Sequence, residues 1–546
     1  MSLASLSRGP DAQTILHVGN ASIGFNRLEI VGGAKGAQPI YNKDRSLILI
    51  CNGEIFNYEQ LREEFLADHT FTTTSDVEVI LHLYEKFGED CVQYLEGQFG
   101  FAIYDAKKEH VFLGRDRFGI IPLFVLISEE ALVISSSLFA IASSGYSTKT
   151  LNPLAIAQIQ MFYGPRPPST IVEDIYQLPP ATTACVSFGS KQLHPKKYWD
   201  FTKDSIKLPL KESLSASVSR RIDKSKFGLY VSGGIDSSII AGLAYRLAKE
   251  KPIMFSIIFE DKRFDESEYQ KIIAKKWGYE WRSVVVNAKK IADNFDRTIR
   301  FLESPITRFA PIPLVLLSNE VNKEGIKYVL CGEGADELFM GYPVFESGKA
   351  SYESKWNDGM RYVNVFHDRK IPSLLEKNRI ELDKETSSEN PLLAMRKKEI
   401  TTKLSSYLLS AQGDRVSMAN SVEQRFPFLD EGVWNAALSL SKKELFDKFG
   451  GKAALRKAFN KLLPTAILSR KKQGYLAPDI DILKILLKDK YYLSILSKEN
   501  LEETKIFDYI KVARLIRNVK KGEDGATNTL ILILSTQIFH YHLKNA

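Results

Sequence analysis

The residues of this chain best suited to chemistry lie in one short segment, Ser232-Gly233-Gly234-Ile235-Asp236-Ser237-Ser238, which runs directly into a stretch with helical spacing. Glycines allow the backbone to approach an anion, and hydroxyls together with the amides of a helix start can bind it. The segment differs from the GxxxxGK[ST] loop of common nucleotide triphosphatases, because no lysine follows its second glycine. A tight Ser/Gly turn would also fit the first three residues, but the aspartate and the two further serines favour a phosphate-binding loop.

Other motifs along the chain also combine charged and polar residues. Carboxylates stand in Cys331-Gly332-Glu333-Gly334-Ala335-Asp336-Glu337, and a lysine stands in Gly451-Lys452-Ala453-Ala454-Leu455-Arg456. Taken singly, such carboxylates would be read as surface caps or ion pairs. Further polar motifs lie at residues 8–11, 27–31, 52–57, 75–78, 114–119, 414–419 and 421–430.

The elements that must position the central motifs alternate between strand and helix. Apolar runs at residues 227–231, 253–259, 281–286 and 328–331 predict strands, and residues 237–249, 265–277 and 313–323 have helical spacing. This alternation predicts a parallel, doubly wound α/β sheet with its ligand site at the carboxyl ends of the strands. From about residue 351 the pattern is mostly helical.

The first third of the chain has a different texture. Short runs of β-formers, such as residues 47–51, 110–113 and 131–134, are separated by Gly, Asn and Asp, and residues 76–87 have helical spacing. This pattern predicts a layered α+β domain dominated by sheet. We therefore expect two domains, at residues 1–200 and 201–546.

Composition narrows the function classes. Of 546 residues, 44% are hydrophobic and 26% are charged, which excludes disordered, collagenous and disulfide-scaffold proteins. The net charge of +8 is small for this length and predicts no nucleic-acid partner, although it suits anionic small substrates. The basic run Arg470-Lys471-Lys472 is interpreted as a solvated helix end. Four scattered cysteines, no signal peptide and no long apolar run predict a cytoplasmic protein without a membrane segment.

Taken together and in order, these motifs resemble the glutamine-dependent asparagine synthetase family over nearly the whole chain. The resemblance implies an α+β N-terminal-nucleophile-type sandwich, the class II glutamine amidotransferase domain, followed by an ATP-pyrophosphatase domain with a helical C-terminal region. It implies that ATP, with Mg²⁺, activates aspartate as an acyl-adenylate, that glutamine or ammonia supplies nitrogen, and that asparagine, AMP and pyrophosphate are released. A homodimer is also expected from the resemblance.

The resemblance also implies residue roles. Asp236 and Asp336 would hold Mg²⁺ on the ATP phosphates, Lys452 would neutralise charge on the α-phosphate and pyrophosphate, and Glu333 would orient ammonia or take its proton. Further nucleotide contacts are expected from Ser232, Gly233, Gly234, Ser237, Ser238, Ser256, Cys331 and Gly332. Glutamine binding is expected from Arg27 for the carboxylate, Asn52 and Gly53 for the oxyanion, and Glu54 and Asp76 for the amine.

The chain departs from the family at its start. The family's glutaminase nucleophile is an N-terminal Cys exposed by removal of Met1, whereas this chain has Ser2 and reaches Arg8 before a strand could form. Cys51 adjoins Asn52 and Gly53 but lies in a predicted strand without a free amine, so we interpret it as a core residue. The glutaminase step is therefore expected to be inactive in the chain as written. Either the coding sequence begins at a downstream Met, or the protein binds glutamine without cleaving it.

Two alternatives stand beside asparagine formation. The synthetase domain could amidate another carboxylate or close an amide ring, as do the β-lactam synthetases and lasso-peptide cyclases that resemble this family and also lack the Cys. Against this, Glu333 and the Gly-Ala-Asp-Glu that follows it remain as in asparagine synthetases. A non-catalytic glutamine-binding protein is disfavoured because Asp236, Asp336 and Lys452 are retained. We expect residues 366–408 to carry any difference in acceptor.

Overall fold

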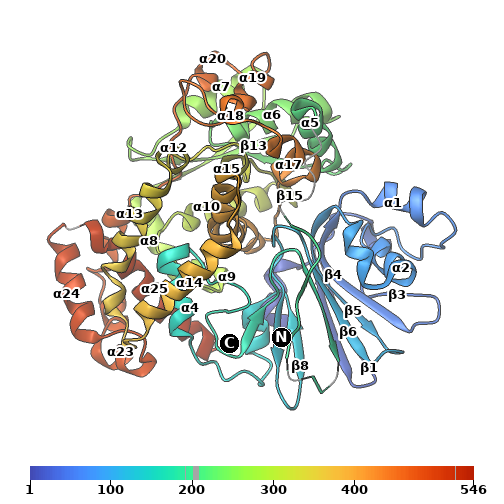
Figure 1. The fold of residues 1–546 in the computed structure, drawn as a ribbon, viewed down its shortest axis with the longest axis horizontal. Helices are drawn as coiled ribbons and strands as arrows, with labels where there is room; N and C mark the ends of the chain where they lie inside the picture. The colour runs from blue at the N-terminus through green and yellow to red at the C-terminus, as the bar shows by residue number, and fades with distance from the viewer. Residues whose placement is uncertain (188, 191, 201–207, 523) are drawn as a thin grey trace.

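A computed structural model describes residues 1–187, 189–190, 192–200, 208–522 and 524–546. The predicted boundary after residue 200 adjoins residues 201–207, which lie outside the described residues. Figure 1 shows a strand-rich N-terminal unit beside a larger unit of helices around a second sheet.

The N-terminal unit is built on a six-stranded antiparallel sheet. Its strands are, in spatial order, β11 (Lys196–Lys197), β10 (Thr182–Ser187), β6 (His110–Arg115), β5 (Gly97–Asp105), β4 (Leu47–Ile55) and β3 (Ile40–Tyr41). Alternate side chains point to opposite faces of such a sheet. One face, with Phe99, Phe101 and Phe112, packs with residues of α1 (Tyr58–Phe65) and α2 (Glu78–Phe87).

The opposite face of this sheet is covered by a second, smaller sheet. Ala102, Leu113 and Ala184 pack against Val125 of the three-stranded sheet β8 (Leu132–Ser135), β7 (Phe124–Ile127) and β9 (Ile175–Gln177). The result is helices on sheet on sheet, which confirms the expected α+β sandwich. The other elements of this unit are η1 (Ser2–Arg8), β1 (Ala12–Val18), β2 (Ala21–Arg27), η2 (Gly33–Gly36), η3 (Gly88–Gln93), α3 (Leu138–Ala142) and α4 (Pro153–Phe162).

The second unit contains the predicted parallel sheet. Its spatial order is β14 (Trp281–Val286), β13 (Ile253–Phe259), β12 (Gly228–Tyr230), β15 (Tyr328–Leu330) and β16 (Glu423–Arg425), and every pairing is parallel. The chain order reverses between β12 and β15, so a switch point lies between these two strands. The helices up to β15 are α5 (Leu210–Arg220), α6 (Ile235–Leu247), α7 (Ser267–Trp277), α8 (Ala288–Asp293), α9 (Phe295–Leu302) and α10 (Pro311–Lys323).

The rest of the chain is helical apart from β16, as expected. Its elements are α11 (Ala335–Leu338), α12 (Val344–Ser347), α13 (Lys349–Met360), η4 (Val363–Val365), α14 (Ile371–Glu385), α15 (Pro391–Glu399), the π-helical η5 (Ile400–Leu408) and η6 (Ser410–Asp414), α16 (Arg415–Met418), η7 (Pro427–Leu429), α17 (Glu431–Leu438), α18 (Lys442–Leu445), α19 (Ala453–Ala458), α20 (Thr465–Leu468), α21 (Asp479–Leu486), α22 (Lys490–Ile495), α23 (Lys498–Thr504), α24 (Tyr509–Lys520), η8 (Asp524–Ala526) and α25 (Thr527–Lys544). Within the described ranges, no helix combines the length and apolar character needed to span a membrane.

The two units share a continuous core. Helix α4 leaves the N-terminal unit and packs against α14 and α25 (Figure 1). Ring contacts such as Phe139 on Phe539, with centroids 5.4 Å apart, extend this core across the boundary. The sandwich and the helical region are therefore held by buried apolar surface as well as by polar contacts.

Candidate active site

The Ser/Gly/Asp segment forms the turn between β12 and α6, at the carboxyl edge of the parallel sheet. Gly233 has φ +79°, and a Cβ added there would lie 2.6 Å from Tyr269 Cβ, so only glycine fits. Ser238 donates to the carbonyl oxygen of Gly234 over 2.7 Å, and the amide of Ser232 donates to Ser237 Oγ over 3.2 Å. These hydrogen bonds fold the turn on itself.

The loop after β15 meets this turn across the switch point. A Cβ added at Gly332 would lie 2.8 Å from the amide nitrogen of Ser237, so the two loops approach as closely as glycine allows. Ser256 of β13 donates to the carbonyl oxygen of Val231 over 2.7 Å, which ties the neighbouring strand to the same turn. The structure therefore brings the predicted segments at residues 232–238, 256 and 331–336 into one place.

Lys452 joins the two predicted aspartates. Its Nζ lies 2.6 Å from Asp236 Oδ2 and 2.6 Å from Asp336 Oδ1, and its side chain is buried. The lysine backbone is held by a hydrogen bond from its amide to the carbonyl oxygen of Phe339 over 2.8 Å. A Cβ added at Gly341 would lie only 2.0 Å from Asp336 Oδ1, so this glycine makes room for the ion-paired cluster.

A second lysine completes the cluster, and it corrects one expectation from the sequence. Lys472 Nζ lies 2.6 Å from Asp336 Oδ2, although these residues are 136 positions apart in the chain. Arg470 forms an ion pair with Glu266, and its guanidinium carbon lies 4.1 Å from the Tyr269 ring centroid. The interpretation of residues 470–472 as a solvated helix end was therefore wrong for these two side chains. In the sequence, only the positive charge of Arg470 and Lys472 indicated that they could bind acidic partners. The partners themselves could not be identified, because they lie in distant segments of the chain.

The charges in the cluster shift the proton affinities of its acids. Burial raises the pKa of Glu333 to about 7, with Lys472 opposing and Asp336 reinforcing the effect. Burial also acts to raise the pKa of Asp336, but Lys452 and Lys472 outweigh it and hold this pKa well below its usual range. Glu333 can therefore exchange a proton near neutral pH while Asp336 stays ionised.

Lys403, which the sequence did not single out, adjoins the cluster beside Tyr342 and Glu337. Tyr342 donates its hydroxyl proton to Glu337 Oε1 over 2.6 Å, and Lys403 Nζ lies 3.5 Å from the Tyr342 ring centroid. Burial raises the pKa of Glu337 to about 7. Lys403 lies within residues 366–408, where acceptor differences were expected.

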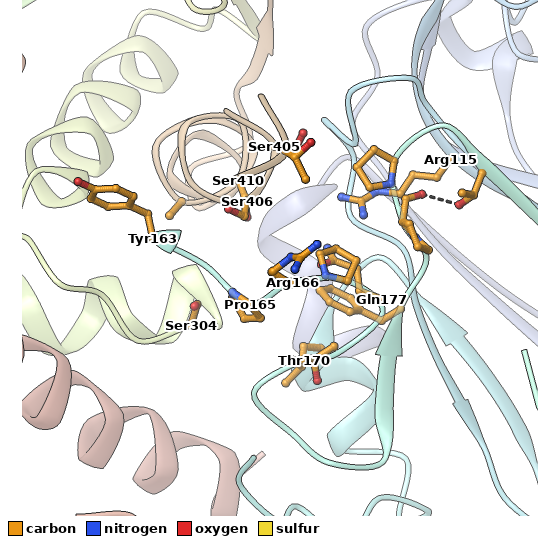
Figure 2. Close-up of a pocket in the computed structure, with 18 of the residues that line it drawn as sticks. Arg115, Tyr163, Pro165, Arg166, Thr170, Gln177, Ser304, Ser405, Ser406 and Ser410 are labelled. Atoms are coloured by element: carbon orange, nitrogen blue, oxygen red, sulfur yellow. Dashed lines mark hydrogen bonds between the residues drawn. The ribbon is translucent and has the colours of Figure 1, made fainter. Parts of the chain in front are cut away.

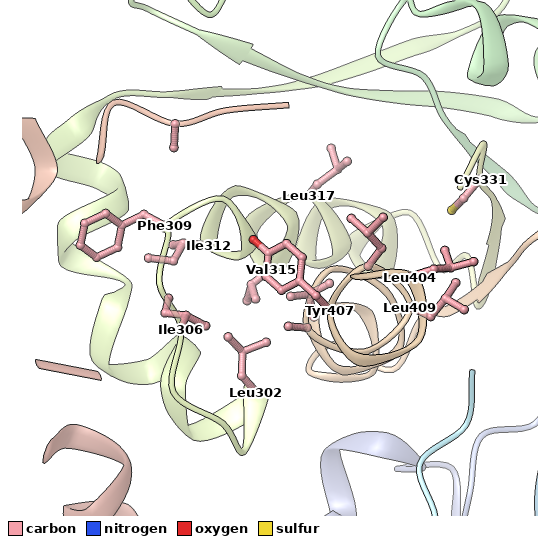
Figure 3. Close-up of a cluster of buried hydrophobic side chains, with 14 of the residues drawn as sticks. Leu302, Ile306, Phe309, Ile312, Val315, Leu317, Cys331, Leu404, Tyr407 and Leu409 are labelled. Carbon is pink, nitrogen blue, oxygen red and sulfur yellow. The ribbon is translucent and has the colours of Figure 1, made fainter. Parts of the chain in front are cut away.

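A buried apolar layer supports this side of the site. Figure 3 shows side chains of α10 and η5 packed together, with Cys331 from the end of β15 at the margin of the layer. The thiol of Cys331 lies 3.3 Å from Gln424 Oε1 in β16, and burial raises its pKa well above the usual value. Cys331 is therefore a packing residue whose backbone, and not its thiol, adjoins the site.

The residues predicted to bind glutamine lie on and around β4. Asn52 and Gly53 pair with Gly100 and Phe99 of β5, and Gly53 has φ +132° with a carbonyl oxygen 1.9 Å from where a Cβ would lie. Cys51 is 3% exposed, and burial raises the pKa of its thiol well above the usual value. Its interpretation as a core residue is confirmed.

The charged residues of this second group are already engaged. Arg27 donates to the carbonyl oxygen of Gly33 over 2.6 Å, and Asp76 Oδ2 accepts from the Ile55 amide over 2.7 Å. Glu54 forms an ion pair with Arg425, the last residue of β16. Burial raises the pKa of Asp76 to about 6 and also raises that of Glu54, which the Arg425 guanidinium opposes. Glu54 thus lies at the contact between the two units.

Comparison with known proteins covers both the charged cluster at the parallel sheet and the residues on and around β4. Residues 209–541 match the asparagine synthase family, and residues 1–199 match the glutamine amidotransferase domain. The chain belongs to the asparagine synthase family. As a family member it is an enzyme of the ATP-dependent amidotransferase/ligase class, with an N-terminal amidotransferase domain.

Similar proteins cover most of the chain. Glutamine-hydrolyzing asparagine synthetase 1 of Bacillus subtilis (strain 168) is 29% identical over 525 residues, covering 86% of this chain and 82% of that protein. Asparagine synthetase B of Escherichia coli (strain K12) is 28% identical over 492 residues, covering 86% and 76%. A putative asparagine synthetase of Methanocaldococcus jannaschii is 31% identical over 431 residues, covering 78% and 70%.

Proposed function

We propose that this asparagine synthase family member joins a carboxylate to ammonia through an acyl-adenylate, releasing AMP and pyrophosphate, and that aspartate is the acceptor. The observation that carries the proposal is the Lys452 ammonium held between Asp236 and Asp336 at the switch point of the parallel sheet. A site of this kind can hold a polyphosphate beside two carboxylates, which is what adenylation requires.

The chain's own groups fit ATP. The glycine turn and the start of α6 would bind the β- and γ-phosphates, and backbone near Ser256 and Cys331 would contact the nucleoside. Lys452 and Lys472 would stabilise charge on the α-phosphate and on the departing pyrophosphate. Both lysines already lie 2.6 Å from the Asp336 carboxylate, so they are positioned without reorganisation.

The two aspartates also fit Mg²⁺. Asp236 Oδ1 is buried and accepts no hydrogen bond from the described residues, and Asp336 Oδ1 is buried with the Lys452 ammonium 2.6 Å away. Carboxylate oxygens are ligands that Mg²⁺ prefers, and the ion usually takes its remaining ligands from substrate phosphates and water. When bound, Mg²⁺ would neutralise phosphate charge during adenylation.

We propose the following reaction at this site. A carboxylate oxygen of the acceptor attacks the α-phosphorus of ATP, and the bond to pyrophosphate breaks. Ammonia attacks the acyl carbon of the adenylate, AMP leaves, and Glu333 accepts the proton that nitrogen loses. Its pKa of about 7 suits this exchange. Lys403, beside Tyr342, supports an acceptor that carries a second negative group, as aspartate does.

We also propose free ammonia as the nitrogen source of the chain as given. Ser2 donates its hydroxyl proton to Asn26 over 2.9 Å, and Cys51 is buried inside β4, so neither is presented as a nucleophile beside Asn52 and Gly53. Glutamine would then be bound without being cleaved. The expected homodimer and cytoplasmic location stay predictions.

The test is pyrophosphate release by the purified protein with ATP and Mg²⁺, scanned over aspartate and other carboxylates with ammonia or glutamine supplied. We expect release with aspartate and ammonia, and little with glutamine. Asp236→Ala and Lys452→Ala should each lower turnover at least about 100-fold, because each removes charge stabilisation in the transition state. Lys457→Ala, on the exposed side of α19, is the matched control and should keep activity.

Three results would redirect the proposal. Normal turnover in Lys452→Ala would remove the site assignment. Release with another carboxylate but not aspartate would support the alternative acceptor or ring closure. No release with any acid, together with measurable glutamine binding, would favour a non-catalytic glutamine-binding protein.

A further inference from the structure

A cavity of about 180 Å³ lies between the N-terminal unit and the helical region. Residues of both units form its wall, including Phe124 and Gln177 from the first and Ser405 and Ser410 from η5 and η6. Figure 2 shows these serines, with Ser304, arranged around the cavity opposite Gln177. None of the residues assigned above to ATP or glutamine lines this cavity.

Most charged side chains around the cavity are already compensated. Arg117 Nη1 lies 2.9 Å from Glu431, and Arg166 Nη2 lies 2.7 Å from Glu385. Arg115 donates to three backbone carbonyl oxygens over 2.6 to 2.7 Å. Glu303 accepts hydrogen bonds from the Ser137 hydroxyl and the Leu138 amide. These groups shape the wall and offer little net charge to a ligand.

Arg415 differs from Arg115 in that only one of its guanidinium N–H groups is bonded within the described ranges. It is 9% exposed and forms no ion pair with any carboxylate in the described ranges, and its one recorded hydrogen bond runs from Nη1 to the carbonyl oxygen of Leu302. Its guanidinium carbon lies 5.7 Å from the Phe124 ring centroid, so the group is held between the two units. A second cavity, of about 230 Å³, is also lined by Arg415.

Burying a guanidinium without a carboxylate partner costs free energy, because no ion pair compensates for the hydration that the charge loses. The nearby Glu303 carboxylate lowers this cost through space, because its field favours the charged arginine, yet its oxygens are directed to Ser137 and Leu138. An arginine fork with free N–H groups binds a planar carboxylate or a phosphate oxygen pair. The surrounding hydroxyls and the Gln177 amide can bind further polar atoms of the same molecule.

We propose that this interdomain cavity binds a small molecule bearing a carboxylate or a phosphate, with Arg415 as its anchor. The site is separate from the proposed nucleotide site, so the inference goes beyond the proposed function. Because the wall comes from both units, the ligand binds only when they are docked. Binding therefore stabilises the docked arrangement.

The experiment is calorimetric titration of the full chain at constant ionic strength, with inorganic phosphate in one arm and malate in the other. We expect saturable binding of at least one probe, and the arm that binds identifies the oxyanion. Arg415→Gln should weaken that binding at least about tenfold, since the anchoring charge is lost. Arg361→Gln removes the same charge from an exposed position and should leave the affinity within about twofold.

Two further variants keep the result interpretable. Ser410→Leu places apolar bulk at the cavity wall without altering charge, so it should also abolish binding. This variant still tests the proposal if Arg415→Gln fails to fold. Lys452→Ala should retain binding, because the nucleotide cluster is a different site. Equal affinity in wild type and Ser410→Leu, loss of binding in Lys452→Ala, or no saturable binding of either probe would each overturn the proposal, whatever the outcome of the pyrophosphate assay.

Discussion

At the scale of single residues, the cluster depends on lysines whose partners are distant in the chain. Lys472 is about one-third exposed along its side chain, yet its ammonium lies 2.6 Å from Asp336. Burial lowers the pKa of Lys472, but Asp336 and Asp236 outweigh it, so the net shift is upward. The lysine is therefore held charged where phosphate would arrive.

Replacing Lys472 with Met should slow pyrophosphate release about tenfold or more, because one of the two cations facing the leaving group is lost. Steady-state kinetics with varied ATP would show the loss in kcat more than in KM if the lysine acts mainly on developing charge. Lys471→Met, at the exposed neighbouring position, is the control. A Lys472→Met enzyme with wild-type kcat and KM would contradict this role.

At the scale of elements, the start of α2 shows how a helix beside the glutamine group is held. Glu78, its first residue, is fully buried and accepts hydrogen bonds from the amides of Thr72 and Thr73, each over 2.7 Å. Burial alone would raise the pKa of Glu78, but the His82 imidazole, 3.5 Å away, and hydrogen bonds from Thr73 and Thr72 lower it to about 2. The ionised carboxylate thus fixes the loop that precedes Asp76.

Glu78→Gln should lower the free energy of unfolding of the N-terminal unit by about 2 to 3 kcal/mol at pH 6. Because the folded pKa lies below the ordinary value of 4.5, the stabilisation is present above pH 4.5 and disappears as the pH falls through 2. Urea unfolding monitored by hydrogen exchange would measure this stabilisation, with wild type and Glu78→Gln compared at pH 6 and near pH 2.5. Glu63→Gln, exposed on α1, should show no such difference, and a pH-independent gap between wild type and Glu78→Gln would refute the assignment.

At the scale of the whole molecule, polar contacts bind the two units around a buried arginine. Arg425 is 0% exposed, pairs with Glu54 of the N-terminal unit and lies with its guanidinium carbon 3.8 Å from the Tyr328 ring centroid. Gln98 donates to the carbonyl oxygen of Gln424 over 3.1 Å, so β5, an inner strand of one sheet, meets β16, the edge strand of the other. Since β16 pairs with β15, the residues predicted to bind glutamine are linked through these two strands to the loop that carries Glu333.

Arg425→Met should destabilise the docking of the units by about 3 to 5 kcal/mol, because it leaves Glu54 buried without a counter-charge. Differential scanning calorimetry should then show two transitions in place of one cooperative unfolding event. Adding Glu54→Gln should recover part of the loss, which separates charge burial from lost packing. A single unshifted transition in Arg425→Met would show that the pair does not hold the units together.

Particular elements show how far the sequence predicts the fold. Strands β13 and β14 were predicted with the bounds observed. Strand β13 lies inside the sheet and is a nearly continuous apolar run, as expected for a strand buried on both faces, whereas β14 is an edge strand in which Ser283 and Val285 are exposed. Strand β16 was not predicted as a strand, since Glu423, Gln424 and Arg425 are polar and the chain beyond about residue 351 was expected to be mostly helical. In the fold, the polar groups of this strand are satisfied both by distant residues, Glu54 on Arg425 and Gln98 on Gln424, and by nearby ones such as Ser417.

The sequence by itself determined the chemistry of the loops and the strand and helix alternation that places them, because a glycine turn between strand and helix is a local property. The tertiary structure alone decided which charges meet. It paired Lys472 with Asp336 and Glu54 with Arg425, and it left Arg415 buried beside two cavities with no ion-pair partner among the described residues. The physical reason is that local propensity acts over a few residues, whereas charge pairing in a core depends on packing between segments hundreds of residues apart.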